Sequence, residues 1–254
     1  MARVAKPKVQ PAKPLAKLTG AHRLLGYSLR FYRSHWRVLG PVMAAALLVN
    51  LLIGWGTAGE VASTYQGLWF GFVSCGLIWS IRHVGGRERP RLGQAYWTGT
   101  GSILKFLVVL SVLALASLPF LIGALVFNYL VYQAAADLMI QLVGGGISLL
   151  LGLLSLILLS RQLVALIVVT LPEVAPFKAL RTSWQISRRR TWRLTARFLI
   201  LLIYLAGISA VISVGGGLLT LTPGWAQAVS TAATYLVALP ILYIYLFLIY
   251  KELI

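Results

Sequence analysis

Apolar runs longer than about 18 residues recur along the whole chain and limit the folds that it can adopt. Runs of this length are typical of helices that cross a lipid bilayer. Of the 254 residues, 59% are hydrophobic and 11% are charged, whereas a soluble domain has about 45–50% apolar and about 25% charged residues. A soluble fold could not cover this much apolar surface. We therefore predict an all-α, polytopic membrane protein.

The positions of Lys and Arg divide the chain into six predicted transmembrane helices. These lie near 38–56, 62–82, 103–127, 142–171, 196–220 and 225–250. The segments proposed to face the cytoplasm are 1–37, 83–102, 172–195 and 251–254. Together with the adjoining span ends they hold every Lys and Arg except Arg161, and the proposed outer loops hold none. By the positive-inside rule, this predicts a multi-pass protein of the cytoplasmic (inner) membrane with both termini in the cytoplasm.

The N-terminal region is predicted to form a tail and then an interfacial helix. Residues 1–19 carry five basic residues, three prolines and no acid, which favours a disordered tail that either lies on anionic lipid or is solvated. No apolar core with a cleavage site is seen there, so we expect the first span to be an uncleaved anchor. Residues 20–37 have a basic face with Arg30, Arg33 and Arg37 and a separate apolar face, typical of a helix in the headgroup plane.

The remainder, 20–254, is predicted to be one integral membrane domain with a threefold internal repeat. Its units cover about 20–82, 91–171 and 176–250, each an interfacial helix followed by two spans. Units one and three align at an offset of 156 residues, which pairs Leu24 with Leu180, Arg33 with Arg189, Trp36 with Trp192 and Arg37 with Arg193. The implied architecture has three interfacial amphipathic helices on the cytoplasmic face, one for each helical hairpin.

Two features predict how the spans pack. Ser63, Gly67, Gly71 and Cys75 form a small-residue stripe along the second span, which lets a neighbouring helix approach closely. Pro119 and Pro240 interrupt the third and sixth spans and are expected to kink them.

The sequence contains no recognisable catalytic constellation. His22, His35 and His83 lie at predicted interfaces without metal-ligand spacing. The run TGTGS at 98–102 lacks the Lys-Ser/Thr ending of a phosphate loop. We therefore expect no enzymatic activity, no metal, no cofactor and no nucleic acid partner. An intramembrane lipid enzyme remains the weakest alternative.

Arg161 is the one basic residue predicted to lie inside a span, next to Gln162. A charge in the bilayer normally has a partner or faces a cavity. Glu173 is the nearest acidic residue, but direct pairing would need a break in the helix between them. In the second interpretation the fourth span ends near Arg161, whose side chain extends to the interface. Residues 164–171 would then form a buried re-entrant or interfacial segment.

A basic and aromatic cluster follows in the next cytoplasmic segment. It contains Trp184, Arg188, Arg189, Arg190, Trp192 and Arg193. Such residues suit binding of anionic lipid headgroups. They suit equally a role in fixing topology, with the tryptophans in the aromatic belt of the interface.

The order of residues around this cluster resembles a known membrane family. Arg161 and Glu173 are followed by Ala179–Leu180, Ser183–Trp184 and then a basic helix. This pattern is similar to the membrane domain of glycerophosphoryl diester phosphodiesterases and of related stand-alone bacterial membrane proteins. The similarity is clearest over 160–200, and the predicted layout extends it to most of the chain. The matching positions are Arg161, Glu173 and Ser183.

The resemblance implies a membrane module with a lipid-linked or regulatory role. In fused members a separate soluble domain hydrolyses glycerophosphodiesters. We expect that domain to be absent, because six spans occupy most of the chain and no His/Glu/Asp hydrolase cluster remains. The function predicted first is therefore a non-enzymatic accessory or scaffold module that binds anionic lipid or a membrane protein partner. The alternative is a transporter or channel for a small or lipid-like substrate, with Arg161 lining the path.

Overall fold

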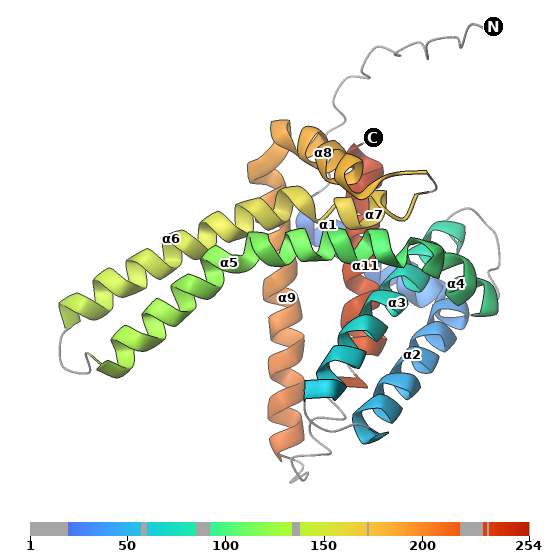
Figure 1. Ribbon diagram of the computed structural model, residues 1–254, viewed down its shortest axis with the longest axis horizontal. Coiled ribbons are helices and arrows are strands. Elements are labelled where there is room, and N and C mark those ends of the chain that lie inside the picture. Colours follow the sequence, from blue (N-terminus) through green and yellow to red (C-terminus); the bar gives the residue numbers. More distant parts are fainter. Residues whose placement is uncertain are drawn as a thin grey trace, which may run out of the picture.

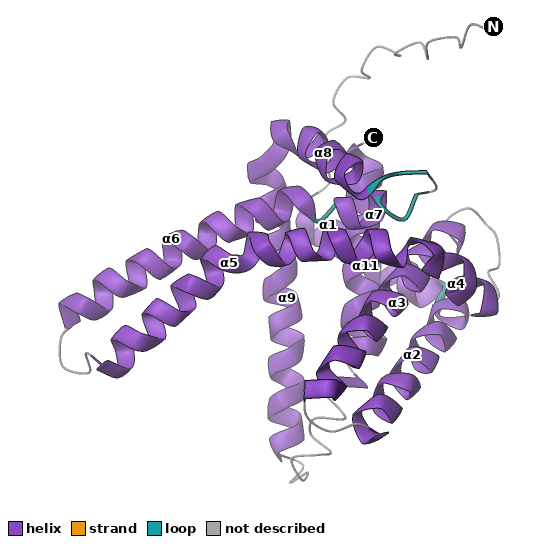
Figure 2. Ribbon diagram, in the orientation of Figure 1, coloured by secondary structure: helices purple, strands orange, loops and turns teal. Residues whose placement is uncertain are grey.

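The structure is a computed structural model (Figure 1), and every regular element in the part described is a helix (Figure 2). It describes residues 20–56, 60–84, 92–133, 138–171, 173–218, 231–232 and 234–253. The predicted tail 1–19 lies outside these ranges, as does the proposed outer loop 221–224. The prediction of an all-α protein is confirmed.

Five helices are long enough to be spans on their own, and shorter ones separate them. The long helices are α2 (Trp36–Gly56), α3 (Glu60–Val84), α5 (Ile103–Gln133), α6 (Leu138–Gln162) and α9 (Thr191–Leu218). A π-helical turn, η3 (Thr234–Ala238), continues into α11 (Leu239–Leu253). The short elements are α1 (Ala21–Ser34), α4 (Leu92–Gly99), η1 (Thr100–Ser102), α7 (Ala165–Val168), α8 (Pro176–Ser187) and η2 (Arg188–Arg190).

Four stretches of the described chain are long and apolar enough to cross a membrane. They are Ile103–Leu130, Gln141–Val168, Thr191–Val211 and Thr234–Leu253. A fifth, Ala21–Leu52, qualifies only if α1 and α2 are counted together. The helix α3 has 25 residues but is not among the four. These stretches identify a membrane protein, whereas the division into six spans stays a prediction.

The helix α1 turns into α2 through an elbow of 86° at His35. It buries Leu24, Leu25 and Tyr32 on one side and exposes its arginines on the other. An amphipathic helix at a right angle to the following apolar helix is the arrangement expected at a membrane interface. The predicted interfacial helix over 20–37 therefore corresponds to α1, which ends three residues before its predicted end.

The helices α5 and α6 form a long antiparallel hairpin that projects from the other helices (Figure 1). Figure 1 shows α5 bent about midway along its length, and Pro119, which has no N–H to donate to the preceding turn, lies near the middle of this helix in the sequence. The hairpin is joined by hydroxyl groups: Ser148 donates to the carbonyl of Gly123 at 2.6 Å and Ser155 to that of Ala116 at 2.9 Å. Only 22% and 11% of the two apolar windows is buried inside the protein.

Of the four apolar stretches, the one that contains α11 is the most buried, and α11 packs against α1, α3 and α7. Half of the window Thr234–Leu253 is buried, and Tyr243, Ile244 and Tyr245 are among the least exposed side chains of the protein.

The small-residue stripe of α3 also forms a close contact. A Cβ atom at Gly71 would lie 3.2 Å from the side chain of Leu107 on α5.

Gly123 tests how closely α5 and α6 approach. A Cβ atom there would lie 3.2 Å from both Cα and the carbonyl oxygen of Ser148, whereas one at Gly146 would meet nothing within 4 Å. Overpacking costs about 1–3 kcal/mol, so Gly123→Leu should lower the thermal midpoint in mild detergent by about 2–4 °C or more. Gly146→Leu is the control and should leave it unchanged. Equal midpoints for the two variants would show that the hairpin is not tightly packed here.

Candidate functional site

The helix α6 ends one residue after Arg161, and the chain then folds back into the protein. Residues Leu163 and Val164 form a turn, and the single-turn helix α7 follows. All side chains from Val164 to Val169 are buried. The stretch Gln141–Val168 still qualifies as a span by length and hydropathy, but the helix predicted to run unbroken over 142–171 is interrupted. The helix end near Arg161 and the buried segment after it agree with part of the second interpretation, whereas the extension of the Arg161 side chain to the interface stays a prediction.

Arg161 lies against α8 and is the centre of the candidate site. Its guanidinium carbon is 3.5 Å from the ring centroid of Trp184, a cation–π contact worth about 0.5–2 kcal/mol. Its carbonyl oxygen accepts hydrogen bonds from the hydroxyls of Ser183 at 2.7 Å and Ser187 at 3.3 Å. These bonds satisfy a carbonyl that the end of α6 leaves without a helical N–H.

The guanidinium of Arg161 keeps unused hydrogen-bonding capacity. Its Nε is buried and has no hydrogen-bond partner, and the same holds for Oε1 of the neighbouring Gln162. Buried polar atoms without a partner are uncommon in proteins, so each is a position where a ligand or an ordered water could bind. The break between α6 and α7 therefore holds two buried polar atoms without a partner, one of which belongs to the guanidinium cation of Arg161.

Glu173 is not the partner of Arg161. It lies exposed in the turn after α7, with a positive φ of 63°, and no ion pair joins these two residues, both of which the structure describes. Arg161 instead uses the aromatic face of Trp184. Of the three positions matching the family pattern, the structure brings Arg161 and Ser183 together and leaves Glu173 apart.

Polar contacts from other helices hold the segment around α7 in place. Arg82 on α3 donates from Nη1 to the carbonyl of Thr170 at 3.0 Å. Ser160, at the end of α6, shares a hydrogen bond of 2.8 Å with Thr195 on α9. No role for Arg82 is predicted from the sequence. Its only signal was a basic residue at the end of an apolar run.

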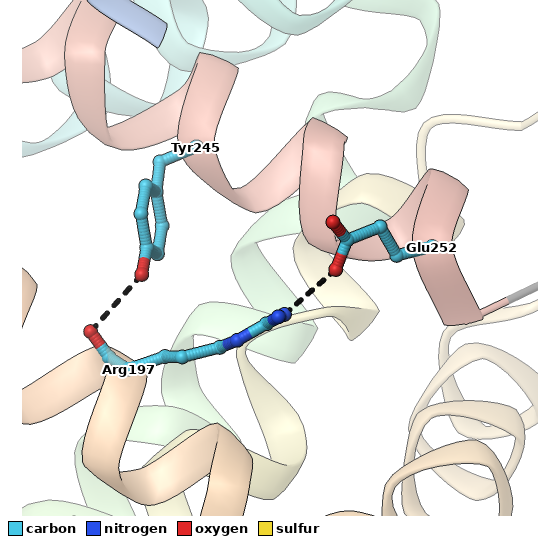
Figure 3. Close-up of polar contacts among 3 residues, drawn as sticks. All are labelled: Arg197, Tyr245 and Glu252. Atoms are coloured by element: carbon cyan, nitrogen blue, oxygen red, sulfur yellow. Dashed lines mark hydrogen bonds and ion pairs between the residues drawn. The ribbon is translucent and has the colours of Figure 1, made fainter. Parts of the chain in front are cut away.

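A buried ion pair links α9 to α11 and was also missed. Nη1 of Arg197 lies 2.8 Å from Oε2 of Glu252, and the hydroxyl of Tyr245 donates to the carbonyl of Arg197 at 3.2 Å (Figure 3). The side chain of Arg197 is 5% exposed and that of Glu252 22%. The available signal was that Arg197 and Glu252 fall at span ends predicted to lie on the same side of the membrane.

The basic side chains proposed for lipid headgroups are mostly exposed. On α1 and the start of α2, Arg30, Arg33 and Arg37 are exposed. In the second group Arg188 and Arg193 are exposed and Arg190 is half-buried. The side chain of Arg189 is not described.

The tryptophans of the basic and aromatic cluster have different environments. Trp192 is 71% exposed, whereas Trp184 is 37% exposed and stacks on Arg161. Trp184 therefore contributes to the internal contact between α6 and α8 and offers only part of its ring to a ligand. Trp192 remains free to lie at a membrane interface.

Within the described residues, no group of three or more His, Cys, Asp or Glu side chains is placed to hold a metal ion. The fold and the site thus define an all-helical membrane protein with a broken helix, a half-buried arginine at the break and exposed basic helices. No family model matches the chain, and no curated protein or solved structure matches it either. The resemblance to the phosphodiesterase membrane domain stays a prediction.

The ion pair of Arg197 with Glu252 gives a stability test. Replacing Glu252 by Gln leaves a buried guanidinium without its counter-charge. Removing one partner of a fully buried pair costs about 3–5 kcal/mol, and the partial exposure of Glu252 reduces this to about 2–3 kcal/mol. We expect Glu252→Gln to lower the thermal midpoint of the detergent-solubilised protein by several degrees. Glu173→Gln, at an exposed turn, is the matched control, and a similar loss in both would argue against the pair.

Proposed function

We propose that this protein is a non-enzymatic accessory or scaffold module of the cytoplasmic membrane that binds anionic lipid through its basic helices. The observation that carries the proposal is the exposure of arginines beside exposed tryptophans at two helix junctions. Arg37 adjoins Trp36, which is 48% exposed, and Arg193 adjoins Trp192, which is 71% exposed. Each basic residue near an anionic surface contributes about 1 kcal/mol, and tryptophan favours the same interfacial depth.

The proposal includes six spans with both termini in the cytoplasm. The helices α2 and α3 supply the two spans beyond the four apolar stretches, with 21 and 25 residues. At 1.5 Å per residue they are about 30 Å or longer, which is enough to cross the hydrocarbon core. The exposed arginines then lie on the cytoplasmic side, as the positive-inside rule requires.

It also includes three units, each a short helix followed by a hairpin. The contacts of the short helices support this division. The first unit's α1 packs against α9 and α11 of the third, the second unit's α4 packs against α2 and α3 of the first, and the third unit's α8 packs against α5 and α6 of the second. Each short helix therefore docks on the two long helices of the preceding unit. Head-to-tail contacts of this kind close into a ring.

The same type of hydrogen bond accompanies each docking contact. On α1, the hydroxyl of Tyr32 donates to the carbonyl of Leu236. On α4, the hydroxyl of Tyr96 donates to the carbonyl of Val42 at 2.6 Å. On α8, the donor is Ser183 to the carbonyl of Arg161. Burial raises the pKa of Tyr32 and of Tyr96 to about 12, so both hydroxyls stay protonated and can donate at neutral pH.

Lipid retention tests the proposed function. Replacing Arg188, Arg189 and Arg190 by Gln removes three charges, and we expect the number of anionic phospholipids retained after mild extraction to fall by at least half. Each lost basic residue weakens surface attraction by about 1 kcal/mol. Mass spectrometry of the extracted complex counts the lipids. The matched control replaces the same residues by Lys, which keeps the charge and should keep the lipid. Unchanged retention in the Gln variant would contradict the proposal.

A second function, transport of a small anion, is favoured by one observation. The unpartnered Nε of Arg161 and Oε1 of Gln162 lie at the break between α6 and α7. Transporters commonly place substrate sites at interrupted membrane helices, where unpaired polar groups meet the substrate. Arg161 would then attract an anion into the path across the membrane.

Flux measurements separate this alternative from the accessory role. In proteoliposomes loaded with radiolabelled inorganic phosphate or glycerol 3-phosphate, a transporter should release the anion. Arg161→Ala should then slow release at least about tenfold, because the charge that compensates desolvation is gone. Arg181→Ala removes an exposed charge from α8 and should have no effect. Release at the wild-type rate by Arg161→Ala, or no release by the wild-type protein, would count against transport of these anions.

A further inference from the structure

A groove of about 500 Å³ opens at the elbow between α1 and α2. Its volume lies within the range of about 300–1,000 Å³ that is usual for small-molecule sites. The residues that line it are Trp36, Arg37, Gly40, Pro41, Ala44 and Leu236. The first five lie on α2, and Leu236 comes from η3 of the last span. The groove therefore lies where the first unit meets the third.

The shape of the groove follows from residue sizes along α2. Trp36, Gly40 and Ala44 are spaced four residues apart and so share one face of the helix. The tryptophan ring lies against the helix at Gly40, where a Cβ atom would be 3.0 Å from two ring atoms. Beyond the ring, Ala44 is exposed and leaves a recess because its side chain is a single methyl group. Tyr32 fixes the opposite wall by donating a hydrogen bond to the carbonyl of Leu236.

The groove is charged at one end and apolar along its length. Arg37 is exposed at the elbow, and Arg33, one turn earlier in the chain, is exposed on α1. Neither arginine contacts a carboxylate among the described residues. Below them the lining is apolar or has no side chain, from Gly40 and Pro41 to Ala44 and Leu236. A ligand that fits must therefore join an anionic group to a hydrocarbon chain.

We propose that this groove binds one anionic phospholipid, with its phosphate at Arg37 and an acyl chain along Gly40 and Ala44. The inference rests on the proposed function, because it places the elbow at the cytoplasmic interface, and it assigns one defined lipid site to that function. The lipid phosphate supplies the negative charge that Arg33 and Arg37 do not receive from this chain. The exposed ring of Trp36 lies beside the entrance at the depth of the glycerol backbone.

A second groove provides an internal comparison. It has a volume of about 440 Å³ and is lined by Ile203, Tyr204, Gly207, Ile208 and Val211 of α9. None of these side chains carries a charge. A lipid there would be held by its acyl chain, without selection for an anionic headgroup. Selectivity for charge should therefore distinguish the groove at Arg37 from a general acyl-chain surface.

Quenching of Trp36 fluorescence by brominated lipids tests the site directly. The protein is reconstituted in phosphatidylcholine with rising fractions of either phosphatidylglycerol or phosphatidylcholine that carries bromine on an acyl chain. The signal of Trp36 is the difference between the wild-type protein and Trp36→Phe. We expect brominated phosphatidylglycerol to reach half-maximal quenching at about one-tenth the fraction of brominated phosphatidylcholine, the ratio expected for one charge-assisted hydrogen bond.

Three variants identify the groups responsible. Arg37→Gln should reduce the preference for phosphatidylglycerol to about one, because the charge is gone. Arg37→Lys should keep most of it and controls for folding. Ala44→Leu should reduce quenching by both lipids, because the added side chain fills the recess. Equal quenching by both lipids in the wild-type protein would overturn the proposal in favour of a nonselective acyl surface. Absence of quenching by either would overturn it by showing that another segment or a protein partner covers the groove.

The same preparations separate this inference from the broader function. The total number of retained anionic lipids reports on all basic helices, whereas Trp36 quenching reports on the groove. If the Gln variant of Arg188–Arg190 loses lipid while wild-type Trp36 shows no preference, the groove assignment fails and the proposed function stands. If Trp36 shows the preference but total retention never depends on the other arginines, the groove is the lipid site and the proposed role of η2 fails.

Discussion

Polar groups placed among apolar helices are costly when they lack a partner, and this constraint governs how the helices are joined. Water is not present in the hydrocarbon core, so an unpaired carbonyl or guanidinium there is costly. The end of α6 illustrates the solution, because α8 supplies two serine hydroxyls to the carbonyl of Arg161. Near the start of α9 a charged group is paired in a similar way, because Glu252 of α11 neutralises Arg197.

This constraint also explains why the short helices matter more than their length suggests. Hydrophobic burial does little to hold spans together in lipid, so close packing and hydrogen bonds between helices take its place. The helix α4 places Tyr96 against Trp69, with ring centroids 6.2 Å apart, and its hydroxyl reaches α2. It thereby bridges the two helices of the first hairpin. His22 of α1 reaches Tyr204 of α9 at 3.3 Å, while Tyr32 reaches η3.

Features that depend on local sequence patterns were predicted correctly, whereas contacts between residues far apart in the sequence were not predicted. The helical fold, the membrane class and the separate amphipathic helix before α2 follow from periodicity and composition over short windows. For the break after Gln162 the sequence left two interpretations open, because residues 163–171 continue the apolar run and include no glycine or proline before Pro172. The break depends on side chains of α8 and on Arg82, which are far away in the sequence.

The candidate site likewise combines residues that a local pattern identifies with long-range contacts that the sequence does not reveal. The family pattern selected Arg161, Ser183 and Trp184, but spacing alone cannot show that a residue 23 positions later stacks on the arginine. Proximity in the sequence instead suggested Glu173 as the partner of Arg161, but no ion pair joins these two described residues. The pair of Arg197 with Glu252 spans 55 residues and joins helices whose relative positions follow only from the tertiary fold.

The excess of basic over acidic residues bears on all of these contacts. The chain has 23 basic and five acidic residues, and Glu252 is already committed to Arg197. Among the described residues, Arg161 contacts an aromatic ring and Arg82 donates to a backbone carbonyl, so neither uses an acidic side chain. The exposed arginines of α1 and of the segment after α8 form no ion pair with the residues that the structure describes. The anionic lipid that we propose as the ligand would supply their counter-charge, because a membrane surface presents phosphate at the depth proposed for these side chains and the neighbouring tryptophans.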